Sequence, residues 1–142
     1  MKIDETVINA RIYKIQEYLK ILKELKLERR ENFLTDYRIH GLAERYLHLT
    51  IECVLDIGNH LISRLEYEKP ETYQEILLIL GKNSIIPKEF AKKIAKMAGF
   101  RNILIHNYLE INERLVFEYL QNNLSDFEDF NKYIIEYLKR LK

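Results

Sequence analysis

The 142-residue sequence has little of what interrupts or cross-links a chain: one cysteine, two prolines, four glycines and no tryptophan. The single Cys53 excludes an intrachain disulfide framework and a metal site built from several cysteines, as is typical of the reducing cytoplasm. No run approaches the ~18 apolar residues of a membrane-spanning helix, and residues 1–5 carry charges where a signal peptide needs an apolar stretch. We therefore expect a cytoplasmic protein with no membrane partner.

The nearly equal numbers of basic and acidic residues exclude a strong overall positive potential that would attract nucleic acid. The chain has 23 basic and 22 acidic residues, a formal net charge of +1. Any RNA affinity must then come from a local patch. With 47% apolar and 32% charged residues, the composition is typical of one compact domain spanning residues 1–142.

The apolar pattern predicts an all-α bundle of four long helices and one short helix, because apolar residues recur at steps of three and four. Asp4, Thr72 and Asn112 are expected to cap helices, with Thr72-Tyr73-Gln74-Glu75 forming a capping box. Pro87 is expected in the first turn of the fourth long segment's helix. The predicted ranges are 4 to about 27, about 32 to 66, 72–81, 87 toward the segment 101–108, and 112 to about 141.

Two stripes of mostly apolar residues, each along one face of a predicted long helix, are expected to form much of the core. Gly58 lies on the first of them and is expected to allow close helix contact. The stripes are Leu47, Ile51, Leu55, Gly58, Ile62 and Leu65, and then Leu120, Leu124, Phe127, Ile134, Leu138 and Leu141.

The segment Arg101-Asn102-Ile103-Leu104-Ile105-His106-Asn107-Tyr108, which we call the signature segment, concentrates groups suited to phosphodiester chemistry. At ~100° per residue, Asn102 lies near His106 on the helix surface, and Tyr108 returns close to Arg101 if the helix continues that far. Cleavage of RNA without a metal needs proton transfer at the 2′-hydroxyl and the 5′-oxygen, and positive charge on the phosphorane. His106 and Arg101 supply these. DNA lacks the 2′-hydroxyl.

A purely structural interpretation remains open, since Arg and His near a helix C-terminus also interact with the dipole and the unpaired carbonyls.

Two further sets of residues are candidates for supporting roles. Glu52 and Asp56 share a helix face with His60, and we expect them, Asp56 above all, to orient Arg101 or His106; the alternative is a solvated flank with ordinary ion pairs. This trio is too unselective to predict a metal site. Lys88, Lys92 and Lys96 form a row that leads to the signature segment, either as an RNA path or as a solubilising face. His40 and His48 have no obvious partners and are expected at or near the surface.

The ordered segments Glu44–Leu47, Ile51–His60, Lys69–Tyr73, Met97–Asn102 and His106–Tyr108 resemble the HepT branch of the HEPN superfamily, across about two thirds of the chain. The resemblance implies a HEPN-type bundle and a homodimeric, metal-independent endoribonuclease that needs no cofactor. It would be the toxin of a type VII-like toxin-antitoxin system, with both signature segments in a cleft at the dimer interface. It also implies a minimal nucleotidyltransferase antitoxin that transfers AMP onto the signature tyrosine, here Tyr108.

The resemblance leaves some questions open. The RNA cut, whether tRNA or mRNA, and the number of adenylates are not predicted. The alternative function is a non-catalytic helical partner that helps a nucleotidyltransferase bind its substrate.

Overall fold

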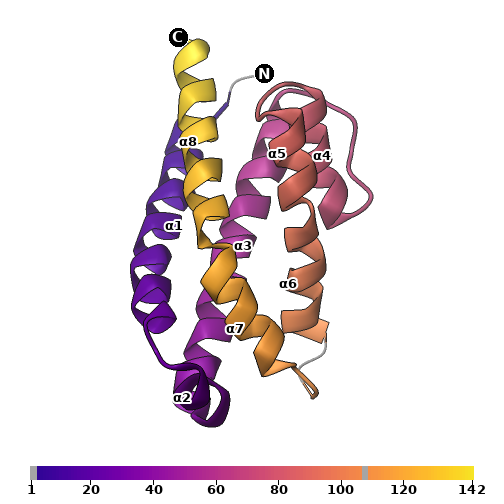
Figure 1. Cartoon of the computed structure of the whole chain (residues 1–142). Coiled ribbons are helices and arrows are strands. Elements are labelled where there is room, and N and C mark those ends of the chain that lie inside the picture. Colours follow the sequence, from indigo (N-terminus) through magenta and orange to yellow (C-terminus); the bar gives the residue numbers. More distant parts are fainter. Residues whose placement is uncertain (1–2, 107–108) are drawn as a thin grey trace.

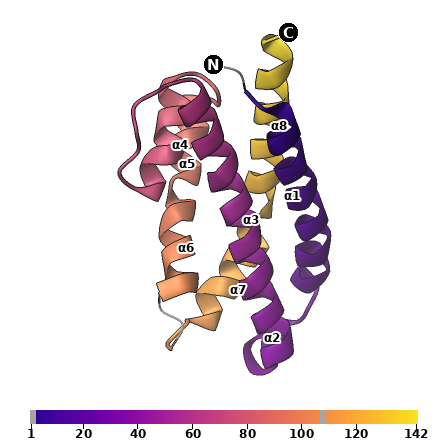
Figure 2. The same ribbon diagram turned by 180° about the vertical axis from the view of Figure 1, so that it is seen from behind.

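The computed structural model describes residues 3–106 and 109–142, and within these ranges all regular structure is helical, which confirms the all-α prediction. α3 lies at the centre, in contact with α1, α4, α6 and α7 (Figures 1 and 2). The start of α1 and the end of α8 lie at one end of the bundle, and α2 lies at the other (Figure 1). The helices are α1 (Glu5–Lys26), α2 (Arg30–Thr35), α3 (Tyr37–Arg64), α4 (Tyr73–Lys82), α5 (Lys88–Ile94), α6 (Lys96–His106), α7 (Glu113–Asn122) and α8 (Leu124–Arg140).

The predicted helix caps are present. Side-chain oxygens of Asp4 and Asn112 accept hydrogen bonds from backbone N–H groups in the first turns of α1 and α7. Thr72 Oγ1 accepts from the Glu75 N–H at 3.1 Å, while Glu75 Oε2 accepts from the N–H of Glu71 at 2.7 Å. The capping box therefore reaches back one residue beyond the cap and fixes the start of α4.

Three of the four predicted long helices are split. Asp36 takes extended dihedral angles (φ −98°, ψ 107°) and caps α3, so the second long helix begins at Tyr37 and follows the short α2. Ala95 separates α5 from α6 but keeps right-handed helical angles, so the two helices run nearly in line (Figure 1). Asn123 separates α7 from α8. Pro87 stands just before α5, as its N-cap, and not in its first turn.

The core follows the two predicted stripes, with exceptions at the helix ends. Leu65 is only partly buried, and Leu141 is 53% exposed because α8 ends at Arg140, so its predicted inward position is wrong. A Cβ atom at Gly58 would lie 2.5 Å from Ile76 Cγ2 of α4, which confirms the close helix contact expected there. Gly58 thus sets how closely α4 approaches α3.

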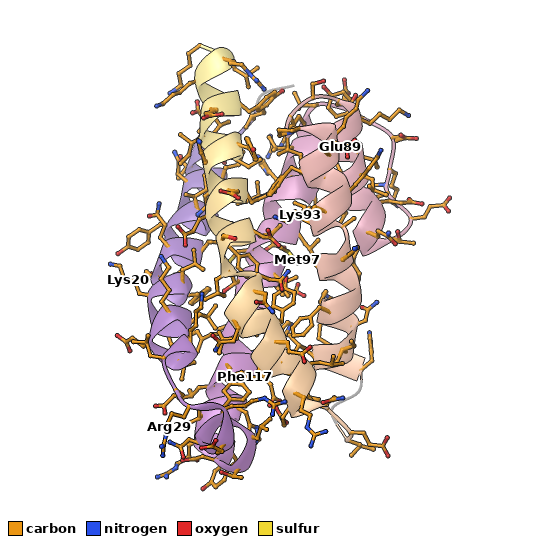
Figure 3. The ribbon with its side chains drawn as sticks, viewed as in Figure 1. Lys20, Arg29, Glu89, Lys93, Met97 and Phe117 are labelled. Carbon is orange, nitrogen blue, oxygen red and sulfur yellow. The ribbon has the colours of Figure 1, made fainter. Side chains whose placement is uncertain are left out.

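Polar and aromatic contacts complete the packing around the second half of the chain. Lys93 and Met97 lie on the side of α5 and α6 that faces α7 and α8 (Figure 3). Lys93 Nζ lies 3.1 Å from Oδ1 of Asp126, a buried carboxylate in the first turn of α8. Phe117 of α7 packs edge-on against Phe33 of α2, with ring centroids 5.2 Å apart. Among the described residues, no helix combines the length and the apolar character needed to cross a membrane.

Candidate active site

The signature segment occupies the second half of α6 and continues past its end. Arg101 and Asn102 lie on α6, and His106 is the last residue of that helix. The Arg101 side chain is only 12% exposed, whereas Asn102 and His106 are exposed. Tyr108, the fourth predicted site residue, lies outside the described residues. The cation is therefore held in the protein, and the imidazole is open to solvent at a helix end.

The Arg101 guanidinium is fixed by three neighbours. Its Nε donates a short hydrogen bond to Oε1 of Glu52 on α3. Its Cζ lies 4.0 Å from the centroid of the Tyr73 ring, in a cation–π contact with the first residue of α4. Its Nη1 makes a long hydrogen bond of 3.5 Å to Asn102 Oδ1. Nη2 makes no hydrogen bond to any described residue, so one terminal N–H edge remains available to a ligand.

Asn102 makes a contact that was not predicted. Its Oδ1 faces Arg101 in the long hydrogen bond described above, so Asn102 supports the guanidinium. Its place beside His106 on the helix surface stays a prediction.

The three polar residues expected on one face of α3 contact three different partners. Glu52 holds Arg101, and its Oε1 also lies 3.5 Å from His48 Nε2. Asp56, one turn further on, pairs instead with Arg11 of α1, its Oδ2 3.7 Å from the arginine Nε. The structure thus gives the supporting role expected above all of Asp56 to Glu52. Burial lowers the pKa of the third residue, His60, whose Nε2 accepts a hydrogen bond from a backbone N–H before α1.

Tyr73 and His48 were missed as neighbours of the site. Tyr73 was recognised only as part of a capping box, and nothing local indicates that its ring meets Arg101 across two helices. His48 was expected to have no partner, although Glu52 follows it at the i+4 spacing that brings helical side chains together. That signal was available in the sequence.

The lysine row stays a prediction. Lys88 and Lys92 lie on α5 and Lys96 begins α6, so the row crosses the break at Ala95, and all three side chains are exposed. Lys92 Nζ lies 3.5 Å from Glu89 Oε1, an exposed contact that contributes little. The row runs along α5 to the start of α6, the helix that carries Arg101, and its three positive charges are exposed to solvent.

A second cluster, His40, Glu44 and Glu113, joins the start of α7 to α3. His40 Nδ1 lies 3.1 Å from Glu44 Oε2 and 3.4 Å from Glu113 Oε1, so the expectation that His40 lacks partners is wrong. Burial, followed by the hydrogen bond and charge of Glu44, raises the pKa of Glu113 to about 8. A proton shared by the two carboxylates explains their proximity. The three donor groups lie within 4.8 Å of one another, close enough to hold a small cation.

Comparisons with known proteins show the family of the chain and its fold. The family model described as "Ribonuclease HepT-like" matches residues 15–134. The chain is 31% identical over 140 residues to a "tRNA nuclease HepT" of Aphanizomenon flos-aquae, covering 99% of this chain and 95% of the relative. It is 30% identical to an "mRNA nuclease HepT" of Shewanella oneidensis, covering 69% and 74% of the two chains.

A solved structure shares the fold. It contains the tri-AMPylated HEPN toxin of Shewanella oneidensis in complex with its MNT antitoxin. The TM-score is 0.83 at 26% identity, and the match covers 92% of this chain and 97% of that chain. The bundle described above is thus a HEPN-like fold.

The Glu113 cluster predicts a dependence of stability on pH. The usual pKa of 4.5 is raised in the fold, so this group's contribution to stability is fully present below about pH 4.5 and is lost as the pH rises through about 8. Glu113→Gln replaces the titrating carboxyl group with an amide, which can still donate a hydrogen bond to Glu44. We expect it to raise the free energy of unfolding at pH 8 by about 1 kcal/mol, with little change near pH 4.5.

Urea unfolding across this pH range measures the effect. Glu118→Gln, an exposed position on the same helix, is the matched control and should leave the pH dependence of wild type. Parallel pH profiles for Glu113→Gln and wild type would contradict the shared proton.

Proposed function

Because this chain belongs to the HepT-like ribonuclease family, we propose that it is the toxin of a HEPN/MNT pair and cleaves RNA through Arg101 and His106. The observation that carries the proposal is the guanidinium held by Glu52 and Tyr73 on the same helix as an exposed imidazole, five residues before it. A fixed cation with a free N–H edge suits a phosphate, and an exposed imidazole suits proton transfer. The arrangement supports the catalytic function over that of a non-catalytic partner.

The proposed reaction needs neither a metal nor a cofactor. The ribose 2′-hydroxyl attacks the adjacent phosphorus, the bond to the 5′-oxygen breaks, and the products carry a 2′,3′-cyclic phosphate and a 5′-hydroxyl. His106 exchanges protons with these oxygens, and Arg101 stabilises the charge that gathers on the phosphorane. Because Glu52 holds Nε, the terminal nitrogens of Arg101 are directed toward the ligand.

We further propose that the active form is a homodimer. In a single-step cleavage, one group removes the 2′-hydroxyl proton while another donates to the leaving oxygen, and one imidazole cannot do both at once. Two copies of the α6 end at a shared cleft supply two imidazoles. The relatives are named for tRNA and for mRNA cleavage, so the substrate is one of these RNA classes.

The proposed regulation acts on Tyr108. The related HEPN toxin is AMPylated and bound to an MNT antitoxin, which supports a minimal nucleotidyltransferase as partner here. Adenylates on Tyr108, two residues after His106, would place negative charge and bulk next to the catalytic groups. The lone Cys53 supports a cytoplasmic location, where both proteins meet ATP and RNA.

Substitution of the catalytic pair tests the function. Arg101→Ala and His106→Ala should each lower RNA cleavage by about 100-fold or more, because each removes a group that acts in the transition state. Cleavage of total RNA by purified protein and growth after expression without an antitoxin are the measurements. Circular dichroism should show an unchanged helical fold. Full cleavage by both variants would reject the assignment, and a wild type that neither cuts RNA nor slows growth would favour the non-catalytic partner.

The support for Arg101 can be tested separately. Glu52→Gln keeps the shape of the side chain but removes the negative charge that faces Nε of Arg101, and we expect a loss in cleavage rate on the order of 10- to 100-fold through misplacement of the guanidinium. Asp56→Asn is the matched control, one turn away on α3 and paired with Arg11, and should cleave at the wild-type rate. A larger loss in Asp56→Asn than in Glu52→Gln would overturn the roles given to these carboxylates.

The proposed regulation predicts a covalent modification of this protein. Incubation with the cognate nucleotidyltransferase and ATP should add one or more adenylate masses to the peptide containing Tyr108 and should abolish cleavage. Tyr108→Phe should gain no adenylate and stay active in the presence of the antitoxin. Mass spectrometry of the digested protein measures the modification. If the Tyr108→Phe variant were modified at another residue and lost its activity, the assignment of Tyr108 would be contradicted.

A further inference from the structure

The Tyr73 ring contacts Arg101, the side chain proposed to bind the scissile phosphate, and is still partly exposed to solvent. Arg101 Cζ lies 4.0 Å from the ring centroid, yet 43% of Tyr73 is exposed. Tyr13 and Tyr37 are also exposed, but the contact of the ring with the Arg101 guanidinium distinguishes Tyr73 from them. An exposed ring next to a phosphate-binding cation can contact the ligand as well.

The placement of Tyr73 comes from the backbone and does not depend on burial. Tyr73 is the first residue of α4, directly after the capping residue Thr72. The capping bonds of Thr72 and Glu75 fix the chain on both sides of it, and the contact of Gly58 with Ile76 holds α4 close to α3. The ring is thus preorganised, so a ligand that stacks on it loses little conformational freedom.

The chemistry next to the ring selects the ligand. A guanidinium stacked on an aromatic face keeps its N–H edge free for a phosphate, while the exposed part of the ring offers a π surface. In a nucleotide, one ribose joins the phosphate to a base, so a phosphate held by Arg101 brings a base near Tyr73. Unpaired bases of RNA stack on such aromatic side chains.

We propose that Tyr73 forms a base-binding subsite, in which an unpaired nucleobase next to the scissile phosphate stacks on the exposed part of its ring. The proposal rests on the function given to Arg101 and adds the class of substrate: RNA that is single-stranded at the cut, with a base free to leave its stack. Tyr73 fixes the register of the strand, and Arg101 and His106 carry out the chemistry.

The experiment measures binding with full-length protein in which His106→Ala blocks cleavage, and with short single-stranded RNA that carries a fluorescent label. On this background, Tyr73→Phe keeps the ring and should bind within about twofold of the parent. Tyr73→Leu keeps apolar bulk but loses the stacking surface, and should bind about 10-fold more weakly. Tyr137→Leu is the matched control, since Tyr137 of α8 also contacts an arginine, Arg140, and it should leave binding unchanged.

A second set of RNAs separates stacking from mere support of Arg101. Each RNA lacks one base but keeps the sugar and phosphate. With Tyr73 present, one missing base should weaken binding about 10-fold, and with Tyr73→Leu that penalty should disappear. The same penalty in both proteins, or none in either, would overturn the subsite. Failure of the proposed function looks different, because Arg101→Ala would then leave RNA binding intact and wild-type protein would not cleave.

Discussion

The contact between Arg101 and Glu52 is the constraint on which the site depends. It joins α6 to α3, the helix that contacts most of the others, and it lies where the guanidinium is only 12% exposed. Removing two charges from water costs free energy that their attraction only partly offsets, so such a pair is poor evidence for stability. Its consequence is geometric, because it fixes the position and orientation of a cation that would otherwise rotate in solvent.

Packing between helices makes that geometry reproducible. Gly58 lets α4 approach α3, and α4 begins with the ring that covers Arg101. The cluster of His40, Glu44 and Glu113 holds the start of α7, so the chain on both sides of residues 107–112 is attached to α3. The site is thus built from the start of α4 and the second half of α6, and both helices are held against α3.

Local signals in the sequence predicted most of the fold. Caps at Asp4, Thr72 and Asn112 and the apolar stripes are decided by residues within a turn or two, so they can be found without tertiary information. The breaks at Asp36 and Asn123 were missed because apolar spacing continues across them. Aspartate and asparagine bond to nearby backbone groups outside helices, and this preference was the available signal.

The site was predicted less completely, for a physical reason. Spacing, together with the resemblance of several ordered segments to the HepT branch, singled out Arg101, Asn102 and His106 as candidates, and the shared helical face singled out Glu52 together with Asp56. Glu52 and Asp56 lie one helical turn apart, a distance of about 5.4 Å along α3. The position of α6 along α3 therefore decides which of the two carboxylates contacts Arg101. That position is set by packing across the whole interface, so a single sequence leaves it undetermined. The contact of Tyr73 with Arg101 depends on two such helix positions.

The same pair also bears on assembly. Glu52 offsets much of the charge of Arg101, and the chain as a whole carries a formal charge of +1. A polyanion is therefore held weakly by one copy, whose remaining nearby cations are exposed lysines in solvent. In the proposed homodimer, two copies facing each other at the ends of α6 would double the fixed cations and exclude water between them, which would strengthen each contact with phosphate. The partial neutralisation that positions Arg101 is thus itself an argument for a shared site.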